Sequence, residues 1–277
     1  MKRTLGITAL FLFAVTSSWG WGRLGHATVA KIAEQHMTPK TKQKVAEILN
    51  NESIILYASY PDERKTDEEM QVSFGVKFND GTKGRGAYPH TFEVDMNFKP
   101  FRGYIDNGRY VKNCIHFIEE YADDLKNNIK NLSQEEKFKE LVCIVHFVGD
   151  MHCPEHIRYN PEDMTIGYYN VKYNGENLRY HTYWDDQCIT ARFTSSFTDI
   201  AYLLDTYTEE QYKEIVKGGP YDWGEDAARC SYHIHKVKEG TVITKQWVND
   251  TAIPLVKSQL TKAGYRLAEL LNRIFDK

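Results

Sequence analysis

Apolar residues recur every three or four positions along most of the chain, and this spacing predicts a mainly helical protein. In residues 107–127 they fall on one face, which indicates an amphipathic helix. The segment FKELVCIVHFVGDMH is apolar nearly all round and follows a capping box of Ser133 and Glu136, so we expect a central, buried helix there. Further helices are expected at 39–49 after the Thr38 cap, after a cap of Thr208 with Gln211, at 225–238 and at 252–274.

Two stretches of the chain, 71–103 and 157–179, are rich in glycine, aromatic residues and single charges instead of periodic apolar residues. They are expected to be long loops, and Asn174-Gly175 is a turn signal for a hairpin in the second. Long ordered loops on a helical scaffold usually carry function. The pattern therefore predicts an all-α, mainly helical single domain over 21–277, with at most a small β-hairpin in a long loop.

The first twenty residues have the layout of a secretory signal peptide. Two basic residues precede an apolar run at 5–15, which is too short to span a membrane, and small residues occupy positions 18 and 20. Cleavage after Gly20 would make Trp21 the mature N-terminus, and an uncleaved anchor is the alternative. We expect a secreted or periplasmic protein.

The net charge and the cysteine content limit the functions that the chain can have. Without the two basic residues of the leader, the chain has 33 basic and 38 acidic residues, a net charge of −5, and no long basic run. A general attraction to duplex phosphates is excluded, so a polyanion would have to be held locally, for example by metal ions. The five cysteines allow at most two disulfides, whose pairing the spacing leaves open, and form no CxxC signature.

The strongest chemical signal is the segment HFVGDMHCPEH. His146 and Asp150 are four residues apart on the expected helix, so they share a face, and His156 follows just beyond the helix end. The segment YHTYWDD repeats the spacing with His181 and Asp185. A lone histidine is more often a hydrogen-bonded core residue than a ligand. Two such pairs together with His156 favour a metal site.

The expected ligands are imidazoles and carboxylates with no obvious thiolate, a set that suits zinc first and manganese or iron second. A carboxylate can bridge, so Asp150 is expected to lie between two ions. Two ions about 3.5–4 Å apart can hold a hydroxide and polarise a phosphoryl oxygen. This chemistry is phosphoester hydrolysis.

Five segments in order resemble the type I nucleases, the zinc-dependent single-strand-specific nucleases of fungi and bifunctional nucleases of plants. They are WGRLGH at Trp21, YPDER, AYPHTF, HFVGDMHCPEH and YHTYWDD. The resemblance runs from Trp21 to Asp185 and implies a phospholipase C/nuclease-like helical fold with three zinc ions. The implied ligand sets are Trp21 (through its α-amine and carbonyl oxygen), His26 and Asp150; Asp62, His90, His146 and Asp150; and His156, His181 and Asp185.

The resemblance also implies a mechanism, with single-stranded DNA or RNA as the substrate and 3′-nucleotides as further candidates. A hydroxide between the two close metals would attack phosphorus, the third zinc would stabilise the leaving 3′-oxygen, and the product would carry a 5′-phosphate. The residues implied to act in catalysis are Asp62, Asp150 and a basic group, Arg64 or Lys65.

The chain departs from the family pattern where substrate would bind. The family places an arginine three residues after the aspartate, where this chain has Lys65, and an aromatic residue after the equivalent of His90, where this chain has Thr91. HCPEH replaces the commoner glutamine-proline-leucine variant. Substrate preference therefore does not transfer, and the candidates for base stacking are Phe92, Tyr88, Tyr168 and Tyr169.

Two other functions remain open. A zinc-dependent phospholipase C shares the N-terminal tryptophan and the three zinc ions, but its last ligand pair typically ends in glutamate, whereas His181 pairs with Asp185. A non-catalytic secreted zinc-binding protein would have closed coordination. No stable protein partner is implied. The sequence leaves open DNA against RNA, endonuclease against 3′-nucleotidase activity, pH optimum, glycosylation and oligomeric state.

Overall fold

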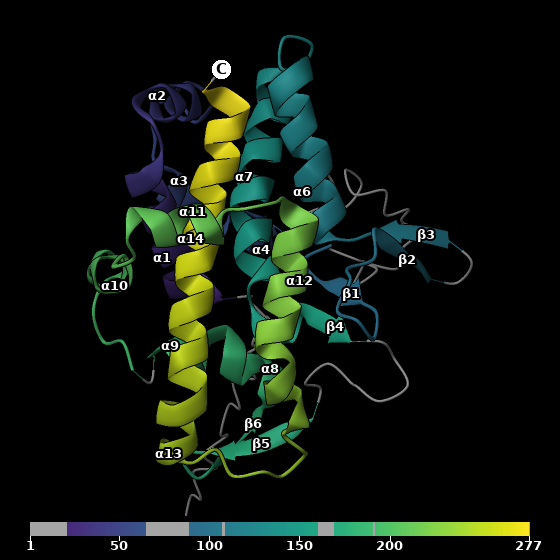
Figure 1. Cartoon of the computed structure of the whole chain (residues 1–277), viewed down its shortest axis with the longest axis vertical. Coiled ribbons are helices and arrows are strands. Elements are labelled where there is room, and N and C mark those ends of the chain that lie inside the picture. The colour runs from purple at the N-terminus through teal and green to yellow at the C-terminus, as the bar shows by residue number, and fades with distance from the viewer. Residues whose placement is uncertain (1–20, 65–88, 107–108, 160–168, 191, 277) are drawn as a thin grey trace, which may run out of the picture.

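The computed structural model describes residues 21–276 except 65–88, 107–108, 160–168 and 191. Long helices run along its longest axis, and short strands lie mostly to one side (Figure 1). The main helices are α1 (Gly22–His36), α2 (Pro39–Ile48), α6 (Cys114–Asp123), α7 (Gln134–Met151), α10 (Phe197–Leu204), α11 (Glu209–Ile215), α12 (Pro220–Ser231) and α14 (Ile253–Phe275). The short ones are α3 (Ile54–Tyr57), α4 (Tyr60–Arg64), α8 (Tyr180–Thr182), α9 (Cys188–Thr190) and α13 (Lys245–Trp247).

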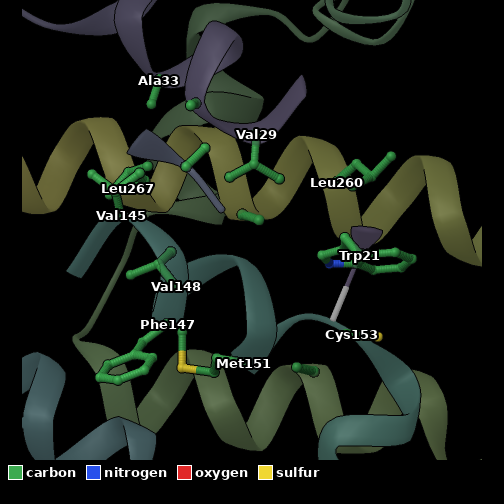
Figure 2. Close-up of a cluster of buried hydrophobic side chains, with 14 of the residues drawn as sticks. Trp21, Val29, Ala33, Val145, Phe147, Val148, Met151, Cys153, Leu260 and Leu267 are labelled. Carbon is green, nitrogen blue, oxygen red and sulfur yellow. The ribbon is translucent and has the colours of Figure 1, made fainter. Parts of the chain in front are cut away.

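The expected central helix is confirmed as α7, in which every residue from Glu140 to Met151 is buried. Helices α1, α7 and α14 share one apolar cluster, in which Val29, Val148 and Leu267 take part (Figure 2). At Gly264 the backbones of α14 and α1 approach closely, because an added Cβ would lie 2.5 Å from the Cβ of Ile32. Glycine is therefore required there by packing.

The helix starts expected from capping signals are confirmed. The side chains of Thr38, Ser133 and Thr208 each accept a hydrogen bond from the backbone N–H three residues later. Ser133 and Thr208 form full capping boxes with Glu136 and Gln211. Capping signals predict helix starts correctly here because each capping interaction involves only a few consecutive residues.

Two helix boundaries differ from the expected ones. Residues 109–112 form strand β3 (Arg109–Lys112), which pairs antiparallel with β2 (Gly103–Asp106), and α6 begins only after Asn113 caps it. A strand replaces the first turn because cross-strand pairing overrides a weak helical pattern. The helix expected at 225–238 begins earlier, at Pro220, and ends at Ser231, where a 3₁₀ turn takes over.

Strands are more numerous than expected. The described residues contain three two-stranded sheets, so the expectation of at most one hairpin is wrong, although the protein is still predominantly helical. The predicted hairpin is confirmed as β5 (Asn170–Tyr173) and β6 (Glu176–Arg179), with positive φ at both Asn174 and Gly175. A parallel pair joins β1 (Phe92–Val94) to β4 (Ile157–Tyr159).

All five cysteines are free thiols, and four of them are buried. The disulfides that the sequence permits therefore do not form in this structure. Within the described part of the chain, no helix has the length and apolar character needed to cross a membrane.

We expect Gly264→Ala to lower the free energy of unfolding by about 1–3 kcal/mol, because the new methyl group overlaps Ile32 and forces α1 and α14 apart. Urea unfolding followed by circular dichroism measures the change. Gly219→Ala is the matched control, since its Cβ would meet nothing within 4 Å. Equal stability of the two variants would contradict this account of the α1–α14 contact.

Candidate metal centre

The sequence-predicted ligands gather around the C-terminal half of α7. His146 and Asp150 come from α7, His26 from α1 and Asp62 from α4. Nε2 of His26 lies 3.3 Å from Oδ1 of Asp150, and Nε2 of His146 lies 3.0 Å from Oδ2. Asp62 joins them, with its Oδ2 3.7 Å from Nε2 of His146. These four side chains, here called the first group, are all buried.

A glycine of α7 makes room for His26. A Cβ on Gly149 would lie 2.7 Å from Nδ1 of His26, so no larger residue fits without moving the imidazole. The ring of His26 stacks on that of His146 with centroids 4.1 Å apart. The N-terminal part of α1, which carries His26, is thereby held against the face of α7 that carries Asp150.

The second group lies just beyond α7, in the 3₁₀ turn Pro154–His156, helix α8 and the π-helical turn Tyr183–Gln187. Nε2 of His156 is 3.6 Å from Oδ1 of Asp185, and Nε2 of His181 is 3.3 Å from Oδ2. The two imidazoles stack at 5.1 Å. Asp150 links the groups, because its Oδ1 is also 3.3 Å from Nδ1 of His156.

Backbone carbonyls lie beside Nδ1 of two key histidines, while Nε2 of each faces a carboxylate oxygen. Nδ1 of His146 donates to the carbonyl of Ala58 at 2.7 Å, and Nδ1 of His156 lies 3.2 Å from the carbonyl of His90. A neutral imidazole that donates through Nδ1 has only a lone pair on Nε2. A lone pair pointing at a carboxylate oxygen is repulsive unless a cation or a second proton lies between them. The donor set therefore fits bound metal, and both histidines have the outer hydrogen bond typical of metal ligands.

Electrostatics keep the central carboxyl charged. Burial alone would raise the pKa of Asp150, but the neighbouring His146 and His156 hold it well below its usual range. Burial would lower the pKa of His156, yet the carboxylates of Asp150 and Asp185 raise it to about 10. The site thus collects negative charge and attracts positive charge, which a metal ion satisfies in place of protons.

Cys153 also lies at the second group, although no sequence pattern had singled it out as a ligand. Its buried thiol lies 3.9 Å from Oδ1 of Asp185, and the ligand atoms of Cys153, His156 and Asp185 all lie within 4.8 Å of one another. The expectation that no thiol accompanies the imidazoles and carboxylates is wrong. The signal was present in HCPEH, where the cysteine stands three residues after Asp150.

The β1–β4 pair positions His90. Because Phe92 pairs with Ile157, the residues just before each strand lie side by side, and the ring of His90 meets that of His156 edge-on at 4.9 Å. The structure thus places His90 beside His156. Its assignment to the ion held by Asp62 and His146 stays a prediction.

The chain just after the expected mature N-terminus lies against the backbone of Asp185. Trp21 is fully buried, and Gly22 has a φ of +56°. A Cβ on Gly22 would lie 3.0 Å from the carbonyl oxygen of Asp185. The carbonyl of Trp21 accepts a hydrogen bond from the N–H of Gly25 at 3.2 Å, so one of its two lone pairs is already used.

The residues expected to bind substrate, so far as the structure describes them, do not gather at one site as the expected metal ligands do. Phe92 is fully buried in the core, so its assignment as a stacking residue is wrong. Tyr169 donates to the carbonyl of Val237 at 2.8 Å and stacks on Tyr180, which is a packing role. Arg64 is exposed, and its guanidinium lies 5.4 Å from the centre of the Tyr60 ring. Three further candidates, Lys65, Tyr88 and Tyr168, lie outside the described residues.

His152 anchors the end of α7. Its Nδ1 donates to the carbonyl of Val148 at 2.8 Å, and its Nε2 accepts from Arg266 of α14 at 2.9 Å. Arg266 in turn donates to Asp226 of α12 at 2.7 Å. This network ties α12 and α14 to the residues that follow Asp150.

Comparison with known proteins gives consistent relatives. Endonuclease 4 of Arabidopsis thaliana is 23% identical over 279 residues, covering 92% of this chain and 89% of its own. Nuclease S1 of Aspergillus oryzae is 25% identical over 307 residues, and the alignment covers 99% of this chain and 98% of the nuclease. Nuclease P1 of Penicillium citrinum is 25% identical over 282 residues, and the alignment covers 92% of this chain and 97% of the nuclease.

Among solved structures, the alpha-toxin of an avian strain of Clostridium perfringens aligns with a TM-score of 0.42 at 12% identity. The alignment covers 94% of this chain and 65% of the toxin. This overlap is too weak to carry an argument about fold or activity.

The family model described as S1/P1 Nuclease matches residues 21–276, and this match includes every residue of the two groups. A match over nearly the whole chain decides the family. The chain belongs to the S1/P1 nuclease family.

Proposed function

We propose that this chain is a secreted or periplasmic zinc-dependent phosphodiesterase that hydrolyses single-stranded DNA and RNA to products with 5′-phosphates, with 3′-nucleotides as further candidate substrates. The proposed enzyme domain covers 21–277, after a signal peptide at 1–20. One observation supports it above all others: the buried carboxylate of Asp150 has an imidazole nitrogen within 3.3 Å of each oxygen. In a nuclease-family chain, such a carboxylate suits a bridge between two metal ions.

Three zinc ions are the proposed cofactors. Their proposed ligands are Trp21, His26 and Asp150; Asp62, His90, His146 and Asp150; and His156, His181 and Asp185. When bound, the two ions that share Asp150 would supply Lewis acidity toward the phosphate and lower the pKa of a water nucleophile. The buried donor set, with Nε2 of both His146 and His156 facing carboxylates, supports this assignment.

The protein's own part in the reaction is orientation. Asp150 presents one oxygen to His26 and the other to His146, so it fixes the distance between these two imidazoles. Asp62 adds a second carboxylate beside His146. The carbonyls of Ala58 and His90 hold the imidazoles in one tautomer, so that Nε2 is the nitrogen that presents its lone pair to a metal ion.

The phosphate clamp is proposed to be Arg64 or Lys65. Of the two, only Arg64 lies among the residues that the structure describes. It stands on α4 two residues after Asp62 of the first group. Its side chain is exposed and therefore accessible to a polyanion. A guanidinium suits bidentate contact with a phosphate better than an ammonium does. Tyr88 and Tyr168 remain the proposed stacking residues.

The purified protein should release nucleotides with 5′-phosphates from single-stranded DNA or RNA, and a chelator should abolish the release. Asp150→Asn should remove the activity and more than one zinc per chain, because an amide is a poor bridge between cations. Asp123→Asn, an exposed aspartate of α6, is the control and should keep both.

Each alternative has its own result in the same experiment. Hydrolysis of a lecithin without nucleotide release would identify a phospholipase C instead. Bound metal without turnover of either substrate would identify a non-catalytic zinc-binding protein. Near-wild-type turnover by Asp150→Asn would contradict the metal-cluster mechanism itself.

Gly149→Ala should lower kcat/KM about 100-fold by displacing His26, because the added methyl group would lie 2.7 Å from Nδ1 of that ring. Metal analysis should show a loss confined to the ion that His26 is proposed to bind. Gly219→Ala again serves as the control. Full activity and full metal content in Gly149→Ala would remove His26 from the proposed ligands.

Export should complete the site. Protein expressed with residues 1–20 and purified after secretion should begin at Trp21 and contain close to three zinc ions per chain. N-terminal sequencing and elemental analysis of one sample measure both. An intact Met1, or an exported protein without metal, would make Trp21 an ordinary buried aromatic residue.

A further inference from the structure

A buried thiol stands among the donors of the second group. Cys153 is fully buried between the end of α7 and the 3₁₀ turn that carries His156. Its backbone N–H donates to the carbonyl of Asp150 at 2.9 Å, and its carbonyl accepts from the N–H of His156 at 3.0 Å. These two bonds make Asp150, Cys153 and His156 one rigid turn, so the thiol has a fixed place relative to both.

The distances around the carboxylate of Asp185 are close to those between ligands of one tetrahedral zinc ion, with the sulfur slightly farther away than the two imidazole nitrogens. With bond lengths of about 2.0–2.2 Å to nitrogen or oxygen and about 2.3 Å to sulfur, two ligand atoms lie about 3.3–3.6 Å apart. Oδ1 of Asp185 is 3.6 Å from Nε2 of His156 and 3.9 Å from Sγ of Cys153. Oδ2 is 3.3 Å from Nε2 of His181.

A second observation also points to a ligand. Nε2 of His156 is fully buried and has no hydrogen-bond partner among the described residues. It faces the same carboxylate oxygen as the sulfur does. An unpartnered nitrogen, a thiol and a carboxylate oxygen thus converge on one small buried volume, which is what a soft, N- and S-binding metal ion requires.

The chain's other buried cysteines show what an ordinary core thiol looks like here. Cys188 donates to the carbonyl of Trp184 at 3.0 Å, four residues earlier in its own helical segment. Cys143 is buried within α7 in the apolar cluster. Neither belongs to a group of three possible ligands found among the described residues, whereas Cys153 does.

We propose that Cys153 binds, as a thiolate, the same metal ion as His156 and Asp185, with His181 as the fourth ligand. On binding, the S–H bond breaks, its proton leaves to solvent and the sulfur lone pair forms the bond to the metal. The inference rests on the metal centre of the proposed function. Four protein donors fill a tetrahedral sphere, so in this chain the third ion is a closed, structural site and not one that takes up a substrate oxygen.

Cobalt substitution tests the proposal without relying on activity. The full-length secreted protein is stripped of metal and titrated with Co²⁺, and we expect a thiolate-to-cobalt charge-transfer band in the near ultraviolet as one ion binds. Cys153→Ala and Cys153→Ser should lose the band, and Cys143→Ala, the matched buried control, should keep it. Zinc affinity at one site should fall at least about tenfold in the Cys153 variants, because even outer partners of metal ligands are worth about that much.

The outcomes separate this proposal from the proposed function. Wild-type protein that binds cobalt without the band, or a Cys153→Ala variant that retains it, overturns the thiolate ligand while leaving the nuclease intact. A band in a protein that releases no nucleotides upholds the thiolate ligand and overturns the nuclease. A missing band in the wild-type protein overturns the thiolate ligand even if a variant fails to fold, and loss of the band in either Cys153→Ala or Cys153→Ser is enough to assign it.

Discussion

The structure depends on one buried negative charge, the carboxylate of Asp150. A carboxylate without water costs several kcal/mol or more unless cations and hydrogen-bond donors compensate it. Here the compensation comes from imidazoles on three separate elements: α1, α7 and the turn after α7. The elements that surround α7 are therefore constrained to bring their histidines to one point.

The scaffold meets this constraint through close contacts. Gly264 lets α14 approach α1, and Gly149 leaves the space that His26 fills. The network from His152 through Arg266 fixes the end of α7 against α12 and α14. Each contact lies outside the metal centre or at its edge, yet each holds a ligand-bearing element in place. Precise positioning of this kind is what turns separate donors into a site that can bind metal.

The thiol of Cys153 gives the second group a different character from the first. The first group contains imidazoles and carboxylates, which suit ions that keep positions open for water or substrate. The second adds sulfur, and thiolate ligands favour zinc over harder ions and are typical of closed structural sites. If Cys153 binds metal as proposed, the first group is the one suited to chemistry and the second is suited to holding the chain together.

The sequence by itself determined helices such as α2, α7 and α14, the capping boxes and the ligand pairs, because these depend on residues at most four positions apart. Ser133 with Glu136 marks the start of α7, and His146 with Asp150 shares a face of it whatever the rest of the chain does. Tertiary structure decided the rest. Strand β3, the parallel β1–β4 pair, the burial of Phe92 and the place of Cys153 beside Asp185 all rest on contacts between segments distant in sequence. No local pattern encodes such contacts, since their free energy comes from packing and burial that exist only once the chain has folded.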